Sequence, residues 1–67
     1  MLTIELEQED DGRWMGEVPL LPGVLVYGVS KADARQKAEA LALRVMADRL
    51  DAGEPIPEEA RSLFADA

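Results

Sequence analysis

The chain has 67 residues, a formal net charge of −7, and neither cysteine nor histidine. This length allows one domain at most, and a domain of this size buries only about 60% of its unfolded surface. The composition excludes disulfides, thiolate metal sites and the usual zinc sites. We therefore expect a permanent partner or homo-oligomerisation, as a dimer or tetramer, to add stability.

The negative charge is concentrated towards both ends of the chain. Residues 1–20 hold six acids against one base, residues 21–51 five bases against four acids, and residues 52–67 four acids against one base. Phosphate contacts need clustered Lys and Arg, so we expect no direct nucleic-acid binding. The charge suits a basic protein partner, or serves solubility alone.

No apolar run approaches the about 20 residues that span a bilayer. The acidic start is also unlike the basic first region of a signal peptide. We expect a cytoplasmic protein that makes no membrane contact.

Residues 2–18 predict a β-hairpin. Residues 2–9 alternate between apolar and polar side chains, which is typical of a strand with one face on a core. Asp11-Gly12 predicts the turn, and residues 13–18 the returning strand. Trp14 and Gly16 share the side on which we expect a helix, since Gly16 permits a close approach. The outward carboxylates of the first strand form an acidic face that is expected to steer a basic partner: Glu5, Glu7 and Glu9.

Pro22-Gly23 predicts a type II turn, after which residues 24–29 predict a third strand. Two leucines between prolines are unusual in a turn. They either fold back on the domain edge or belong to a contact surface. The third strand is apolar on both faces, which suggests that a second subunit covers its outer side. The candidate apolar contacts, for self-association or for a partner, are Leu20, Leu21, Leu25 and Tyr27.

Residues 30–50 predict one long helix. Ser30 is a favourable N-cap, and Gly53 is placed for a left-handed C-cap. Asp33 can accept the N-terminal amide, that of the cap residue, in a weaker form of the capping box, and it can pair with Lys37. Helical spacing predicts one buried face, small at its beginning and larger at its end. Its members are Ala34, Ala38, Leu41, Ala42, Val45, Met46 and Leu50.

After the helix, Pro55 and Pro57 leave room only for a short edge strand centred on Ile56. Residues 58–67 predict a short C-terminal helix with apolar residues Ala60, Leu63 and Phe64. The order predicts a two-layer α+β domain over residues 1–57, a βββαβ arrangement with a mainly antiparallel sheet in the order 3-2-1-4 under one long helix.

Catalysis finds little support in the sequence. There is no Cys or His for nucleophilic chemistry, no glycine-rich phosphate loop, and no indication of a cofactor. The candidate carboxylates for metal binding are Glu9, Asp10 and Asp11, and one hypothesis remains from this class, a small metal-dependent nuclease that uses the Asp10–Asp11 tip. The ordinary explanation of that cluster is a solvated turn, and we expect a protein that is not an enzyme.

The run DGRWMGEVPLLPG, residues 11–23, resembles the signature of the HicB family of antitoxins. In that family an aromatic strand leads to a Val-Pro-x-Leu-Pro-Gly turn, a strand that ends in Gly, and a helix capped by Thr or Ser. Gly28 and Ser30 match the end of this pattern, and residues 54–57 (EPIP) resemble the family's last strand. The resemblance covers about residues 4–57.

The resemblance implies a partial ribonuclease-H-like or double-stranded-RNA-binding-like domain, often oligomeric. It implies a role in binding a small basic mRNA-cleaving toxin, HicA, by covering its RNA-binding face and catalytic histidine. The ten residues after Pro57 are too few for the DNA-binding domain of longer members. The alternative is an orphan homo-oligomeric HicB-like module with a different protein partner.

Overall fold

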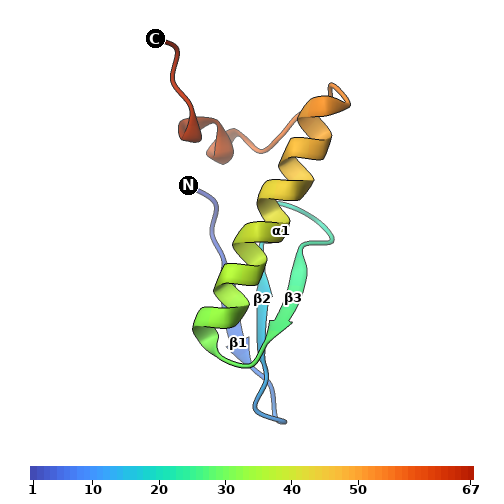
Figure 1. Cartoon of the computed structure of the whole chain (residues 1–67), viewed down its shortest axis with the longest axis vertical. Coiled ribbons are helices and arrows are strands. Elements are labelled where there is room, and N and C mark those ends of the chain that lie inside the picture. Colours follow the sequence, from blue (N-terminus) through green and yellow to red (C-terminus); the bar gives the residue numbers. More distant parts are fainter.

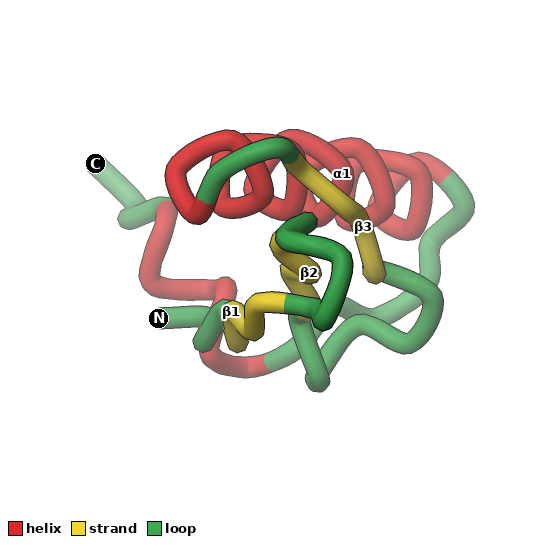
Figure 2. The backbone as a smooth tube through the Cα atoms, turned by 90° about the horizontal axis from the view of Figure 1, so that it is seen from below, coloured by secondary structure: helices red, strands yellow, loops and turns green.

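The computed structural model describes all residues, 1–67, as a small α+β fold. Three strands, β1 (Glu5–Gln8), β2 (Trp14–Glu17) and β3 (Leu25–Gly28), precede the long helix α1 (Lys31–Asp51) and the short 3-10 helix η1 (Glu58–Leu63). The strands form one antiparallel sheet in the order β1-β2-β3. Helix α1 lies across one side of this sheet, so the fold has two layers (Figures 1 and 2).

Helix α1 begins and ends as its sequence predicts. The Ser30 hydroxyl accepts a hydrogen bond from the Asp33 amide at 3.0 Å, and the Asp33 carboxylate pairs with Lys37 at 2.9 Å. At the other end Gly53 has a φ of +73°, and the Glu54 amide bonds the Arg49 carbonyl at 2.8 Å. These are the features of a Schellman motif. One detail differs, because the Asp33 carboxylate accepts from the amide of Val29 rather than from that of the cap residue.

The two predicted turns are also present. Gly12 has a φ of +91° in the β1–β2 hairpin, and its amide bonds the Glu9 carbonyl at 2.9 Å. At the second turn the Val24 amide bonds the Leu21 carbonyl at 3.0 Å, with Gly23 at a φ of +93°. Positive φ at the residue after Pro22 agrees with the predicted type II geometry.

The beginning of α1 touches the sheet almost backbone to backbone. A Cβ atom built on Gly16 would lie 2.9 Å from the Ala34 carbonyl oxygen, and one on Gly28 would lie 2.5 Å from the Ala34 nitrogen. Ala34 and Ala38 are fully buried at this end. The prediction that small residues bring helix and sheet together here is therefore confirmed.

The larger core residues lie towards the other end of α1. Met46 and Ala42 pack there with residues of the β2–β3 connection and with Ala60. The buried cluster consists of Val18, Leu21, Val24, Ala42, Met46 and Ala60. Leu50, which we expected on the buried face, is 53% exposed, although it follows buried Met46 by one turn, because the last turn of α1 extends beyond the end of the strands (Figure 1).

The predicted fourth strand is not confirmed. The sheet has three strands, and no backbone hydrogen bond joins residues 55–57 to β1. Pro55 and Pro57 have no N–H, so Ile56 alone could donate to a ladder. Ile56 instead packs its half-buried side chain against the core.

The C-terminal segment is shorter and less regular than predicted. Residues 58–63 form η1, while residues 64–67 have no regular structure. Only Ala60 is buried, and Leu63 and Phe64 are exposed. A segment this short cannot recover the cost of starting an α-helix, and one 3-10 piece is the usual result.

Candidate protein-binding face of the sheet

The face of the sheet turned away from α1 is covered by no other element. Helix α1 contacts all three strands, whereas η1 contacts none of them. Figure 2 shows α1 along one side of the strands, and Figure 1 places η1 beyond the end of the sheet. We call this uncovered surface the outer face.

Strand register places six side chains in two rows on the outer face. Directly opposite residues project on the same side of a sheet. Gly16 lies under Ala34 on the helix side, so its neighbours in β2 point outward. The rows are Glu5–Glu17–Leu25 and Glu7–Met15–Tyr27.

These rows give the outer face two halves of different chemistry. Glu5, Glu7 and Glu17 form an acidic half along β1 and β2, and no ion pair neutralises any of them. Leu25 and Tyr27 form an apolar half along β3, where they remain 43% and 42% exposed. Adjacent acidic and apolar halves can bind a partner whose apolar contact is bordered by Lys or Arg.

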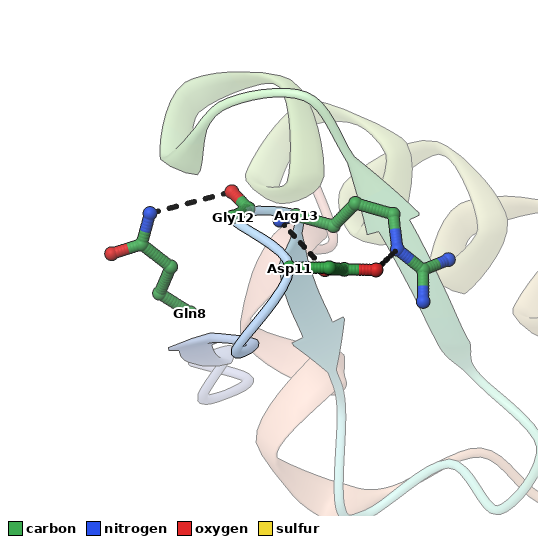
Figure 3. A network of polar contacts seen from close by, with 4 residues as sticks. All are labelled: Gln8, Asp11, Gly12 and Arg13. Atoms are coloured by element: carbon green, nitrogen blue, oxygen red, sulfur yellow. Dashed lines mark hydrogen bonds and ion pairs between the residues drawn. The ribbon is translucent and has the colours of Figure 1, made fainter.

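Arg13 adds a cation beside the apolar half. Its guanidinium carbon lies 4.5 Å from the centre of the Tyr27 ring, a cation–π contact. Its Nε also donates to the Asp11 carboxylate at 2.8 Å, and its backbone N–H donates to the same carboxylate at 3.1 Å (Figure 3). These two hydrogen bonds, with that from the backbone N–H the larger cause, lower the pKa of Asp11. Arg13 is thus held by Asp11 and adds no free positive charge to the face.

The predicted acidic residues lie in two different settings. Glu5 and Glu7 are exposed in β1 on the outer face. Glu9 follows the strand and is half-buried, and its backbone N–H donates to the Arg13 carbonyl at 2.7 Å. Glu5 and Glu7 therefore share one surface, and Glu9 lies at the hairpin.

The predicted apolar contacts also divide. Leu25 and Tyr27 lie together on the outer face, and Leu20 is 46% exposed in the β2–β3 connection. Leu21, in contrast, is 0% exposed. Of the two turn leucines, the first remains outside and the second folds back into the core. This corrects the inclusion of Leu21 among surface contacts.

Two further members of the outer face, Met15 and Glu17, were not among the predicted contact residues. Both are half-buried between their cross-strand neighbours. The alternation of β2 does indicate their side of the sheet, because they alternate with Trp14 and Gly16. The alternation within one strand does not give the pairing between strands, and it is this pairing that places Met15 between Glu7 and Tyr27.

The hairpin acids do not assemble a cation site in this structure. No group of three or more His, Cys, Asp or Glu side chains is placed to hold a metal ion. At the tip, Asp11 is engaged by Arg13, and Gln8 donates to the Gly12 carbonyl at 3.3 Å (Figure 3). These contacts are those of an ordinary, internally bonded turn.

Helix α1 and η1 are both unsuited to crossing a bilayer, being too polar or too short.

No protein family model, curated protein or solved structure matches the chain. The outer face, with its acidic and apolar halves, is the surface on which the structure best supports a function.

Proposed function

We propose that this protein is an antitoxin-like binding protein, not an enzyme, that neutralises a small basic mRNA-cleaving toxin of the HicA type. It acts by covering the toxin's active face. The observation that carries the proposal is the outer face, where three unpaired carboxylates share two cross-strand rows with exposed Leu25 and Tyr27. The resemblance of residues 11–23 to the HicB signature supports the choice of partner.

The physical roles of the two halves differ. A ribonuclease that grips RNA phosphates presents Lys and Arg, and unpaired Glu5, Glu7 and Glu17 attract such a surface over several ångströms. Leu25 and Tyr27 then supply apolar area that leaves water on contact. We expect the carboxylates to control association rate and salt dependence, and the apolar pair to control the lifetime of the complex.

The proposal includes a finer architecture, the partial ribonuclease-H-like fold with sheet order 3-2-1-4. Ile56 already packs on the core, and β1 is an edge strand with a free side. Amide exchange tests this point, because the Ile56 N–H is the only donor available between Pro55 and Pro57. Protection of this amide supports a fourth strand, and rapid exchange rejects it.

The first experiment is a tagged pull-down from the native cell at moderate salt, with mass analysis of the recovered proteins. A stoichiometric, small, basic, His-containing protein whose RNA cleavage stops when this chain is added supports the proposal. Recovery of the chain alone favours the alternative, an orphan HicB-like module with another protein partner and no toxin.

With the recovered protein in hand, paired variants test the outer face itself. Glu5→Gln with Glu7→Gln removes two charges from the acidic half. Glu54→Gln with Asp66→Asn removes two exposed charges elsewhere, neither of them in an ion pair. We expect the first pair to slow association at least about tenfold at low salt and the second to change it little. Equal effects from both pairs would show that net charge, and not the outer face, is responsible.

A further inference from the structure

The free edge of β1 presents backbone groups that have no partner. The Glu9 N–H donates to the Arg13 carbonyl at 2.7 Å, and in an antiparallel pair every second residue then bonds to the neighbouring strand. The intervening residues of β1, Leu6 and Gln8, therefore turn their N–H and C=O groups away from β2. No strand lies on that side, and no loop or turn forms a backbone hydrogen bond with residues 4–8. This edge is thus open to another extended chain.

An apolar groove lies beside this edge, on the helix side of the sheet. Figure 2 shows α1 beside β3 and β2, with β1 farther from the helix. The groove has a volume of about 310 Å³, and its walls come from the first residues of the chain, α1 and η1. Ile4, which precedes β1, lines it together with Leu43 and Met46 of α1 and Leu63 of η1. The helix-side residues of a strand added to β1 would point towards this groove.

Charges along the edge favour a basic occupant. Glu5 and Glu7 are exposed on β1, and neither forms an ion pair. Arg35 is the one basic side chain at the groove, and its Nε lies 3.9 Å from the Glu39 carboxylate, whereas Glu59 makes no ion pair. A strand added to β1 would place alternate side chains directly beside Glu5 and Glu7, where Lys or Arg stabilises the pairing.

The chain itself is poorly suited to fill this edge. Two β1 strands paired edge to edge would bring Glu5 and Glu7 of both copies together, and like charges on neighbouring strands are destabilising. Charged side chains commonly protect an edge strand from such self-pairing. Residues 55–57 have one N–H, that of Ile56, so a strand formed there would leave most of the open groups of β1 unused. The occupant that fits the edge is therefore a segment of another protein.

We propose that the free edge of β1 and the adjoining groove bind an extended segment of another protein in which basic and apolar side chains alternate. The main chain of the segment bonds to the open groups of Leu6 and Gln8 as an additional strand. Its apolar side chains enter the groove, and its Lys or Arg side chains pair with Glu5 and Glu7. The inference goes beyond the proposed function, because it requires neither a toxin nor the apolar half of the outer face.

A capped peptide of about six residues, the usual length of a strand, in which Lys and Leu alternate, serves as the probe. We expect it to bind the full chain and to protect the Leu6 and Gln8 amides from hydrogen exchange. The amide of Tyr27, which has the equivalent position on the free edge of β3, should remain unprotected. Failure to bind, or protection of Tyr27 instead, would overturn the proposal. Protection of Leu6 and Gln8 that rises with protein concentration without peptide would do the same, because a second copy would then occupy the edge.

N-methylated peptides separate strand addition from simple charge attraction. Only every second amide of a strand faces its neighbour, so N-methylation of the Leu amides and of the Lys amides should have unequal effects. We expect one of the two sets to weaken binding at least about tenfold and the other to change it little. Both peptides keep every side chain and every charge of the probe. Equal affinities of the two methylated peptides would reject the added strand.

Two pairs of variants test the same site from the side of this chain. Gln8→Pro removes the open N–H of β1, whereas Gln8→Ala removes the same side chain and keeps it, so only the first should weaken binding, by at least about tenfold. Leu43→Gln makes the groove more polar and should raise the dissociation constant at least about fivefold. Leu50→Gln is its control, because Leu50 is similarly exposed on α1 but does not line the groove. Equal effects within either pair would contradict the site.

Circular dichroism shows whether each variant remains folded, and the methylated peptides test the added strand even if Gln8→Pro does not fold. None of these measurements uses the basic toxin. Failure here therefore leaves the proposed function standing, and failure to recover a toxin leaves this inference standing.

Discussion

Gly28 lies so close to Ala34 that a Cβ atom on the glycine would be 2.5 Å from the Ala34 backbone nitrogen. That atom would also lie 2.8 Å from the Ala34 Cα and from the Asp33 carboxylate. Because two of these neighbours are backbone or Cα atoms, they cannot rotate away as a flexible side chain can. The junction between β3 and the first turn of α1 therefore depends on the absence of a single methyl group.

We predict that Gly28→Ala lowers the free energy of unfolding by about 3 kcal/mol, the cost of overpacking a close contact. Urea unfolding measures the loss. Gly53→Asn is the matched control, because nothing lies within 4 Å of its Cβ position and its φ of +73° is close to the left-handed region in which asparagine occurs after helices. The control should lose less than about 1 kcal/mol. Equal losses at the two glycines would contradict the close approach of helix and sheet.

The adjacent leucines of the β2–β3 connection predict opposite results. Leu21 is fully buried, so Leu21→Ala should lose about 2–5 kcal/mol through lost burial and the cavity left behind. Leu20 is 46% exposed, and Leu20→Ala should lose less than about 1 kcal/mol. Thermal or urea unfolding of both variants measures the two losses in the free energy of unfolding. A larger loss for Leu20→Ala than for Leu21→Ala would contradict the assignment of Leu21 as the buried residue.

The Ser30 cap should contribute measurably to a domain this small. Ser30→Ala removes the hydroxyl that accepts the Asp33 amide, and we expect a loss of about 1 kcal/mol. Ser62→Ala serves as the control, because its hydroxyl only donates to an exposed carbonyl within η1. Its effect should be within about 0.5 kcal/mol. A Ser30 variant as stable as the wild type would show that the cap is dispensable.

Acid should weaken the beginning of α1 through Asp33. Hydrogen bonds from the Lys37 ammonium, first, and from the Val29 N–H hold the pKa of Asp33 below its ordinary value. The group therefore stabilises the fold above the unfolded-state pKa of about 3.9. This stabilisation is lost as the pH falls through the lower folded-state pKa.

We predict that Asp33→Asn lowers the melting temperature at neutral pH and reduces the further fall on acidification. Melting curves from neutral pH down to strong acid measure both effects. Asp48→Asn is the control on the same helix, since its exposed carboxylate makes no hydrogen bond or ion pair. Its melting temperatures should follow those of the wild type. If the melting temperatures of Asp33→Asn also follow those of the wild type, the Asp33 carboxylate does not stabilise the beginning of α1.

Local chemistry in the sequence determined the elements of this protein. Ser30 and Gly53 mark the ends of α1 because a cap acts only on amides and carbonyls within its own turn. Gly12 and Gly23 mark the turns because they alone adopt the positive φ required there. The alternation of side chains also placed Leu25 and Tyr27 on one side of β3, because this alternation depends only on the local backbone of the strand.

Tertiary structure alone decided how those elements share their surfaces. The sequence left Leu20 and Leu21 equivalent, and only packing against Met46 and Ala60 made Leu21 a core residue. Leu50 has the spacing of a buried residue, but the last turn of α1 extends beyond the strands and leaves it 53% exposed. Cross-strand register brought Glu7, Met15 and Tyr27 into one row. These outcomes depend on contacts between residues far apart in the chain, which local propensity and periodicity do not contain.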